Sequence, residues 1–218
     1  MDEMILRIRP DGSVAVEETE NGTRTYKEIS PDSLLKCIKN SARKGKAASG
    51  QLPRNCLSFT AWEDGSKAAC VLFPDGSADM AFMGTEYRGF PLPPLAFRFK
   101  IESDGRVSGA WVKALVGGGW PKPCSKTYRW PFPNASENGL LCLGGNPLPS
   151  CAEMRALDSL PRLILAMPHN LDSFSPGNNR RGLEARELFE ALKGAPRSFY
   201  GESVLMPDGG TLRDFMET

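Results

Sequence analysis

Residues Phe132 to Gly145 read FPNASENGLLCLGG, and the interpretation of the whole chain starts from this stretch. Pro133-Asn134 stands eight residues before Cys142, and Asn138-Gly139 marks a turn between them. Cysteine and asparagine together can do acyl chemistry, in which a thiolate takes up an acyl group. A cysteine that only fills a core needs no such approach. The stretch therefore raises the question whether Cys142 is a nucleophile and Asn134 its neighbour.

This stretch lies within residues 116–149, a segment that is rich in Gly and Pro. Segments of this length without regular elements are usually functional or disordered. Aromatic residues at Trp120, Tyr128, Trp130 and Phe132 argue against disorder. We expect an irregular segment that packs on the rest of the protein and holds the cysteine outside any helix or strand.

Upstream, the sequence has the pattern of an antiparallel meander of four or five strands. Its alternating apolar runs lie at residues 56–62, 68–74, 78–84, 95–102 and 106–114. Asp64-Gly65, Asp75-Gly76 and Ser103-Asp104-Gly105 are strong hairpin signals between successive runs. The proline-rich RGFPLPPL, residues 88–95, cannot lie in a central strand.

The ends of the chain add a β extension and helices. Residues 1–29 alternate, with turns at Asp11-Gly12 and Asn21-Gly22. Ser30 is a plausible N-cap for a helix that follows it and ends in basic residues. The remaining expected elements are two short helices near 152–166 and 183–193, and a strand over 198–206. These patterns predict two parts, an N-terminal β extension at 1–29 and a main domain at 30–218.

Composition excludes several classes of function. The 218 residues carry a net charge of +1 with a pI near 7.6, so the overall charge does not indicate binding to nucleic acid or to an anionic membrane. No apolar run approaches the roughly 20 residues of a membrane span, and the start does not read as a secretory signal. The six cysteines form no CxxC pair and there is one histidine, so we expect no structural zinc site. Free thiols in a reducing cytoplasm are the expectation. Cys37, Cys56 and Cys70 are expected in the core.

The stretch around Cys142 resembles the active-site signature of ubiquitin-conjugating enzymes. Phe132-Pro133-Asn134 stands where that family has His-Pro-Asn, and Cys142-Leu143 closes the motif at the family's spacing. Upstream, GFPLPPLAFRF is similar to the family's proline-rich entry to a strand. The helix, meander, proline turn, irregular segment and cysteine follow in the family's order.

The resemblance extends to a bacterial branch, the protein B family of the PRTRC gene cassettes and its relatives. The shared features are an N-terminal β extension, Cys142-Leu143-Gly144, Pro168-His169 and the terminal LMPDGGTLRDF. The resemblance implies an α+β, ubiquitin-conjugating-enzyme-like fold with flanking helices. It also implies an enzyme that carries a ubiquitin-like modifier as a thioester on Cys142 and passes it to a target. An adenylating activating enzyme that spends ATP would be its partner, in a bacterial operon serving plasmid maintenance or antiphage defence. The enzyme itself would need no metal and no organic cofactor.

The chain also departs from the family pattern. Phe132 replaces the histidine, which suggests an apolar packing role there, and Gly144 replaces the usual Asp. The family's long crossover helix and acidic gate residue are not recognisable. These departures would suit a non-catalytic relative that keeps the fold as a binding subunit, and a buried Cys142 would favour it.

A third hypothesis is a cysteine hydrolase that uses Cys142 with His169. It requires the sulfur and the imidazole within hydrogen-bond reach. His169, the only histidine, is otherwise an active-site neighbour in the bacterial branch or a satisfied structural group. Asn134 is likewise either an oxyanion donor or a turn residue.

Overall fold

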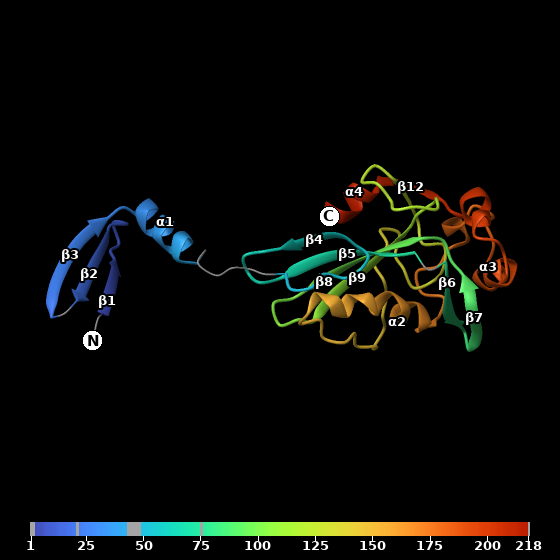
Figure 1. The fold of residues 1–218 in the computed structure, drawn as a ribbon, viewed down its shortest axis with the longest axis horizontal. Coiled ribbons are helices and arrows are strands. Elements are labelled where there is room, and N and C mark those ends of the chain that lie inside the picture. Colours follow the sequence, from blue (N-terminus) through green and yellow to red (C-terminus); the bar gives the residue numbers. More distant parts are fainter. Residues whose placement is uncertain (1–2, 21, 43–48, 75, 218) are drawn as a thin grey trace. The chain divides into compact units, whose positions relative to one another are not determined.

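The computed structural model describes residues 3–20, 22–42, 49–74 and 76–217. The chain divides into two compact units, Met1–Ala48 and Ser49–Thr218 (Figure 1). The expected division at residues 29 and 30 differs from this one by the first helix, which groups with the N-terminal strands. Where the functional domain begins stays a prediction.

The N-terminal unit is an antiparallel three-stranded sheet, β1 (Glu3–Ile8), β2 (Val14–Glu20) and β3 (Thr23–Ile29), followed by helix α1 (Pro31–Ala42). The side chain of Ser30 accepts a hydrogen bond from the backbone N–H of Ser33 at 3.1 Å, which confirms the predicted N-cap. The expected turn residue Asn21 and the basic end of the helix lie outside the described residues.

The main unit is built on a six-stranded antiparallel sheet. Its order is β12-β10-β9-β8-β5-β4. The strands are β4 (Cys56–Ala61), β5 (Lys67–Phe73), β8 (Leu95–Ile101), β9 (Val107–Ala114), β10 (Lys126–Tyr128) and β12 (Pro207–Thr211). Hairpins at Gly65 and Gly105, both with positive φ, join β4 to β5 and β8 to β9 as the Asp-Gly pairs predict.

One predicted pairing is wrong. The run at 78–84 does not extend the meander, because the edge of β5 that it would occupy is taken by β8. It forms β6 (Ser77–Phe82) in a separate small sheet with β7 (Thr85–Pro91) and β11 (Pro168–His169), where β11 runs parallel to β6. The proline-rich segment begins within β7, which is an edge strand of this sheet. This agrees with the expectation that the segment cannot lie in a central strand.

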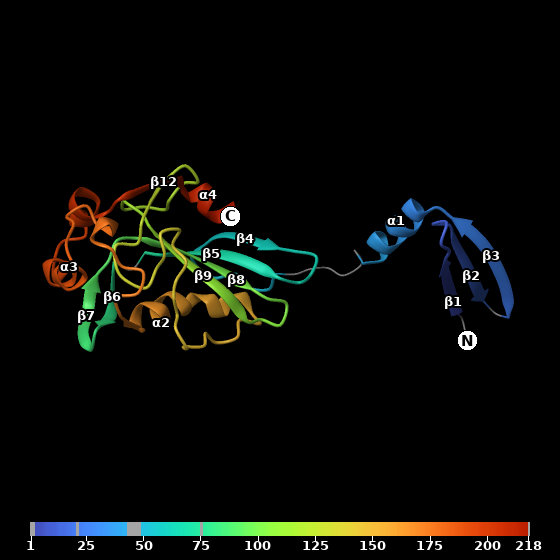
Figure 2. The same cartoon turned by 180° about the vertical axis from the view of Figure 1, so that it is seen from behind.

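The described helices of the main unit are the 3₁₀ turns η1 (Met154–Asp158) and η2 (Pro176–Asn178), the π turn η3 (Tyr200–Val204), and α2 (Leu160–Ala166), α3 (Ala185–Leu192) and α4 (Leu212–Glu217). Helix α2 covers one face of the large sheet and α4 the other, whereas α3 lies beside β6 and β7 (Figures 1 and 2). The strand expected over 198–206 is wrong, because η3 lies there. Tyr200 is fully buried and its hydroxyl donates to the carbonyl of Pro91 at 2.7 Å, a distant contact that fixes a helical turn there.

The two faces have different characters because side chains alternate along each strand. Val71, Phe97 and Val112 pair across β5, β8 and β9 and face the main core with α2 and α3. Burying each such side chain contributes about 1.5–3 kcal/mol. The other face carries a smaller cluster that includes Leu72 and Leu115 and is covered by Leu212 and Phe215 of α4. Among the described residues, no helix is long and apolar enough to cross a membrane.

Candidate active site

The loop that carries the predicted site is fastened to strand β9. The backbone N–H of Leu141 donates to the carbonyl of Ala110 at 2.9 Å, and that of Val112 donates to the carbonyl of Gly139 at 2.9 Å. Gly139 has φ +91°, and a Cβ there would lie 2.5 Å from the carbonyl oxygen of Val112. Only glycine fits this close approach, so the predicted turn glycine sets how the loop meets the sheet.

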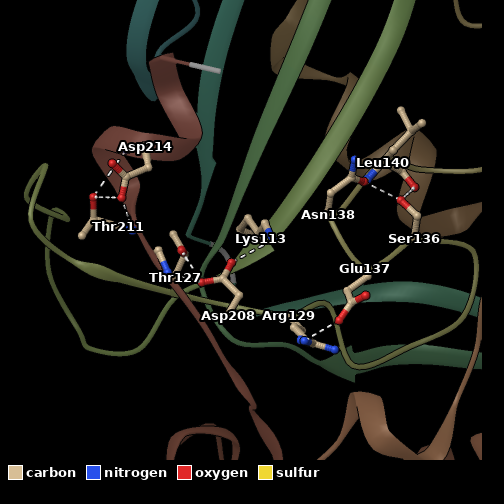
Figure 3. Close-up of polar contacts among 11 residues, drawn as sticks. Lys113, Thr127, Arg129, Ser136, Glu137, Asn138, Leu140, Asp208, Thr211 and Asp214 are labelled. Atoms are coloured by element: carbon tan, nitrogen blue, oxygen red, sulfur yellow. Dashed lines mark hydrogen bonds and ion pairs between the residues drawn. The ribbon is translucent and has the colours of Figure 1, made fainter.

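The turn before the cysteine is closed by side chains. Oδ1 of Asn138 accepts from the hydroxyl of Ser136 at 2.6 Å and from the N–H of Leu140 at 3.1 Å (Figure 3). The N–H of Cys142 then donates to the carbonyl of Asn134 at 2.8 Å. This last bond places the two predicted residues side by side, although they are eight positions apart.

Phe132, which replaces the family histidine, is fully buried. Its ring contacts the rings of Phe90, Trp130, Phe189 and Tyr200, with centroids 4.9 to 6.5 Å apart. The expected apolar packing role is confirmed. The start of the loop is therefore held by aromatic packing. A polar side chain at this buried position would need a hydrogen-bond partner, which Phe132 does not.

Asn134 connects the loop to the segment after β11. Its N–H donates to the carbonyl of Asp172 at 2.8 Å, and its Oδ1 accepts from the N–H of Asn170 at 3.0 Å. Its φ of +64° is a left-handed conformation that asparagine tolerates better than most residues. The amide oxygen is thus committed to the backbone, and the amide nitrogen remains as the donor.

A cavity of about 130 Å³, the Cys142 cavity, lies at this loop. Cys142, Asn134 and His169 all line it, so the structure brings the three predicted residues to one place. Cys142 is exposed. The other lining residues are Leu141, Leu143, Gly144, Asn146, Ile164, Met167, Pro168, Asn170 and Asp172. An exposed Cys142 removes the support that burial would have given to a non-catalytic relative.

His169 is buried, and its Nδ1 lies 3.3 Å from the carbonyl oxygen of Ala81 on β6. Because a carbonyl only accepts, Nδ1 carries the hydrogen and Nε2 is the unprotonated nitrogen. Burial lowers the pKa of His169 from its ordinary value of 6.5, against hydrogen bonds to Ala81 and Met167 that raise it. The imidazole is therefore neutral at pH 7. Within the described part of the chain, no hydrogen bond joins it to Sγ of Cys142.

Asp172 is the residue that sequence reasoning missed. Among the residues described around the Cys142 cavity it supplies the one carboxylate, and its Oδ2 accepts from Nδ2 of Asn170 at 2.8 Å. The N–H of Asp172 donates in return to Oδ1 of Asn170 at 2.8 Å. A signal existed in the sequence, because polar turn formers follow directly after His169 in the run HNLD.

The other described cysteines lie in different surroundings. Cys70 is buried, as expected, and burial is the main reason that its pKa rises to about 12. Burial likewise raises the pKa of Cys151 and that of the half-buried Cys56. Cys37 is exposed on α1, so its expected place in the core is wrong. Among the described residues, no three His, Cys, Asp or Glu side chains gather as a metal site.

Comparison with known proteins identifies one family. The model of prokaryotic E2 family D matches residues 31–162, which begin at the first residue of α1 and include Asn134 and Cys142. His169 and Asp172 lie beyond the matched region. Neither the curated proteins nor the solved structures contain a match. Because the matched region covers more than half of the chain, the protein belongs to prokaryotic E2 family D, a bacterial family of ubiquitin-conjugating-like proteins.

Proposed function

We propose that the protein carries a ubiquitin-like modifier as a thioester on Cys142 and transfers it to a target. The observation that supports this most directly is the exposed thiol of Cys142 in one cavity with Asn134, whose amide oxygen is already engaged. Membership of a ubiquitin-conjugating-like family supports a ubiquitin-like modifier as the source of the acyl group. Residues 30–218 are the proposed catalytic domain.

In the charging step, Sγ of Cys142 attacks the activated acyl carbon at the C-terminus of the modifier. An S–C bond forms, the bond to the activating group breaks, and the thiol proton passes to solvent. An adenylating enzyme supplies the activated modifier. The exposed cysteine on an irregular loop suits this step, since the sulfur must be reached by two large protein partners in turn.

In the transfer step, an amine or hydroxyl of the target attacks the thioester carbon. The carbonyl oxygen becomes an oxyanion, and the Nδ2–H of Asn134, which has no partner among the described residues, is the donor that stabilises it. The Cys142 thiolate then leaves as the amide or ester forms. Asp172 is the carboxylate at the same cavity, placed to attract an incoming ammonium group and to take its proton.

The decisive experiment is a charging assay with the cognate activating enzyme, its modifier and ATP. Wild type should form an adduct that a thiol reductant removes. Cys142→Ala should form none, and Cys142→Ser should form an oxyester that resists the reductant. The exposed Cys124 provides the matched control, so Cys124→Ala should charge like wild type. A normal adduct on Cys142→Ala would refute the proposal.

Hydrolysis is the second candidate because His169 lines the same cavity as Cys142. The neutral imidazole could activate water through Nε2, although the contact with sulfur that a thiolate–imidazolium pair requires is not formed between these two described residues. A hydrolase would discharge the Cys142 adduct to water at the rate at which it discharges to amine. A conjugating enzyme would discharge to water far more slowly.

A further inference from the structure

A second and larger cavity lies on the face of the sheet that α4 covers. Its volume is about 420 Å³, and it shares no lining residue with the Cys142 cavity. Figure 3 shows its polar walls, formed by β9, β10, the β12–α4 segment and the turn at residues 136–140. We call it the Arg98 cavity, after a cation that lines it together with Trp111 and Phe215.

The carboxylates around this cavity are already partnered. Oδ2 of Asp208 lies 2.8 Å from Nζ of Lys113, and its Oδ1 accepts from Thr127 at 2.8 Å and from the N–H of Gly210 at 3.0 Å. Glu137 forms an ion pair with Arg129 (Figure 3). Asp214 accepts from the N–H and the hydroxyl of Thr211. Two of the three cations at the cavity are therefore matched by carboxylates.

Arg98 is the exception. Among the described residues it forms no ion pair and no hydrogen bond, and its Nε is the one buried side-chain nitrogen or oxygen without a partner. The guanidinium lies 4.4 Å from the ring centroid of Trp111 and 5.7 Å from that of Phe215. Burial lowers the pKa of Arg98 from its ordinary value. A partly desolvated cation without a counter-charge is costly, and a ligand carboxylate would remove that cost.

We propose that the Arg98 cavity binds a carboxylate joined to an apolar group. The guanidinium makes charge-assisted hydrogen bonds to the carboxylate, for which its planar fork is suited. Trp111 and Phe215 receive the apolar part. A single negative charge suits Arg98, the one cation at the cavity that pairs with no carboxylate among the described residues, whereas a phosphate dianion would also meet the carboxylates of Asp208, Glu137 and Asp214. The carboxylate can come from a free organic acid or from an acidic side chain of a polypeptide.

The test is a titration of the isotopically labelled full chain, followed by the NMR resonances of the Trp111 indole and the Gly210 amide. The probes are 3-phenylpropionate, its neutral amide, and an end-capped Ala-Glu-Phe-Ala peptide with a Gln version. We expect saturable shifts with the two carboxylate probes, and affinity at least about tenfold weaker for each neutral counterpart. Stronger binding by the peptide than by the free acid identifies a polypeptide source, and the reverse order identifies an organic acid.

Two variants locate the binding. Arg98→Met removes the charge and keeps a long side chain on Trp111, and it should weaken carboxylate binding at least about tenfold. Arg88→Met is the matched control, because the Arg88 side chain is 85% exposed and lies outside the cavity. Equal binding of acid and amide, unchanged binding by Arg98→Met, or no saturable shift at about 20 mM probe would overturn the proposal. The comparison of acid with amide uses wild type alone, so it decides the matter even if Arg98→Met does not fold.

Discussion

The Cys142 cavity and the Arg98 cavity lie against the same loop, residues 134–142, and are built by different interactions. Backbone hydrogen bonds and two asparagine side chains hold the first, and the sulfur of Cys142 in it is exposed. A buried ion pair, Lys113 with Asp208, holds the second; each of these side chains is only 10% exposed. The difference implies that damage to the first cavity should appear in chemistry, and damage to the second in stability.

The largest expected effect comes from breaking the buried ion pair. Lys113→Met leaves Asp208 buried without its cation, so the free energy of unfolding should fall by about 3–5 kcal/mol. Urea unfolding at pH 7 measures it. Lys100→Met is the control, because the Lys100 side chain is 52% exposed in its pair with Glu102, and its loss should cost less than about 1 kcal/mol. If the free energy of unfolding falls equally little in both variants, the ion pair between Lys113 and Asp208 does not stabilise the cavity.

The next effect concerns transfer. Asn134→Asp keeps the oxygen that accepts from Asn170 but removes the Nδ2–H donor, so discharge of the Cys142 adduct should slow roughly 10²–10³-fold. Charging should change by less than about twofold, since the donor acts on the later oxyanion. Single-turnover discharge to an added amine measures the first, and adduct formation the second.

Asn134→Ala is the companion variant, because it removes both the donor and the bond to Asn170. It should show the same slow discharge together with a lower unfolding free energy, by about 1 kcal/mol. If Asn134→Asp discharges like wild type while Asn134→Ala is impaired, the asparagine has only the structural role.

The sequence reveals one cavity better than the other for a physical reason. Cys142 and Asn134 lie in one short loop, and Gly139 and Asn138 fix that loop by local hydrogen bonds, so their arrangement follows from neighbouring residues. The Arg98 cavity is assembled from residues of different strands and of the C-terminal helix, and no local pattern joins them. Asp172 was missed because the run HNLD indicates a turn but does not say which distant loop that turn contacts.

The fold shows the same difference between features fixed by neighbouring residues and features fixed by distant ones. Asp64-Gly65 and its counterpart at Gly105 predict hairpins correctly because turn geometry is local. The pairing of β6 was predicted wrongly because its position depends on β8 competing for the edge of β5. Such competition between distant segments is decided by packing, which a turn signal does not encode.

A smaller effect should appear in the pH dependence of stability. Burial alone would raise the pKa of Asp208, but hydrogen bonds from Lys113, Gly210 and Thr127 hold it below the ordinary value. A depressed carboxyl pKa stabilises the fold above the unfolded-state pKa of about 3.9, and this stability is lost as the pH falls through the folded-state value. Asp208→Asn should therefore be about 2 kcal/mol less stable than wild type at pH 6.

The difference in free energy of unfolding between wild type and Asp208→Asn should shrink as the pH is lowered below about 4. Urea unfolding of both at pH 6, 5, 4 and 3 measures it, and using the difference cancels the other carboxyls with lowered pKa, such as Asp64. A difference that stays constant across this range would show that the charge of Asp208 does not stabilise the folded protein.

The smallest expected effect is at His169, and it separates transfer from hydrolysis. His169→Asn places an amide N–H where Nδ1 donates to the carbonyl of Ala81 and removes Nε2, so the packing contact survives and the potential base does not. A conjugating enzyme relies on the placement of the acceptor, and Asp172, the proposed base, is unchanged in this variant. We therefore expect unchanged charging and discharge to amine within about fivefold of wild type, equivalent to about 1 kcal/mol. The measurement is single-turnover discharge of the Cys142 adduct with and without amine, for both proteins. A hydrolase would behave differently, because water must be activated in every turnover. If water discharges the wild-type adduct as fast as amine does, and His169→Asn does neither, the imidazole is the base of a hydrolase and the transfer proposal is wrong.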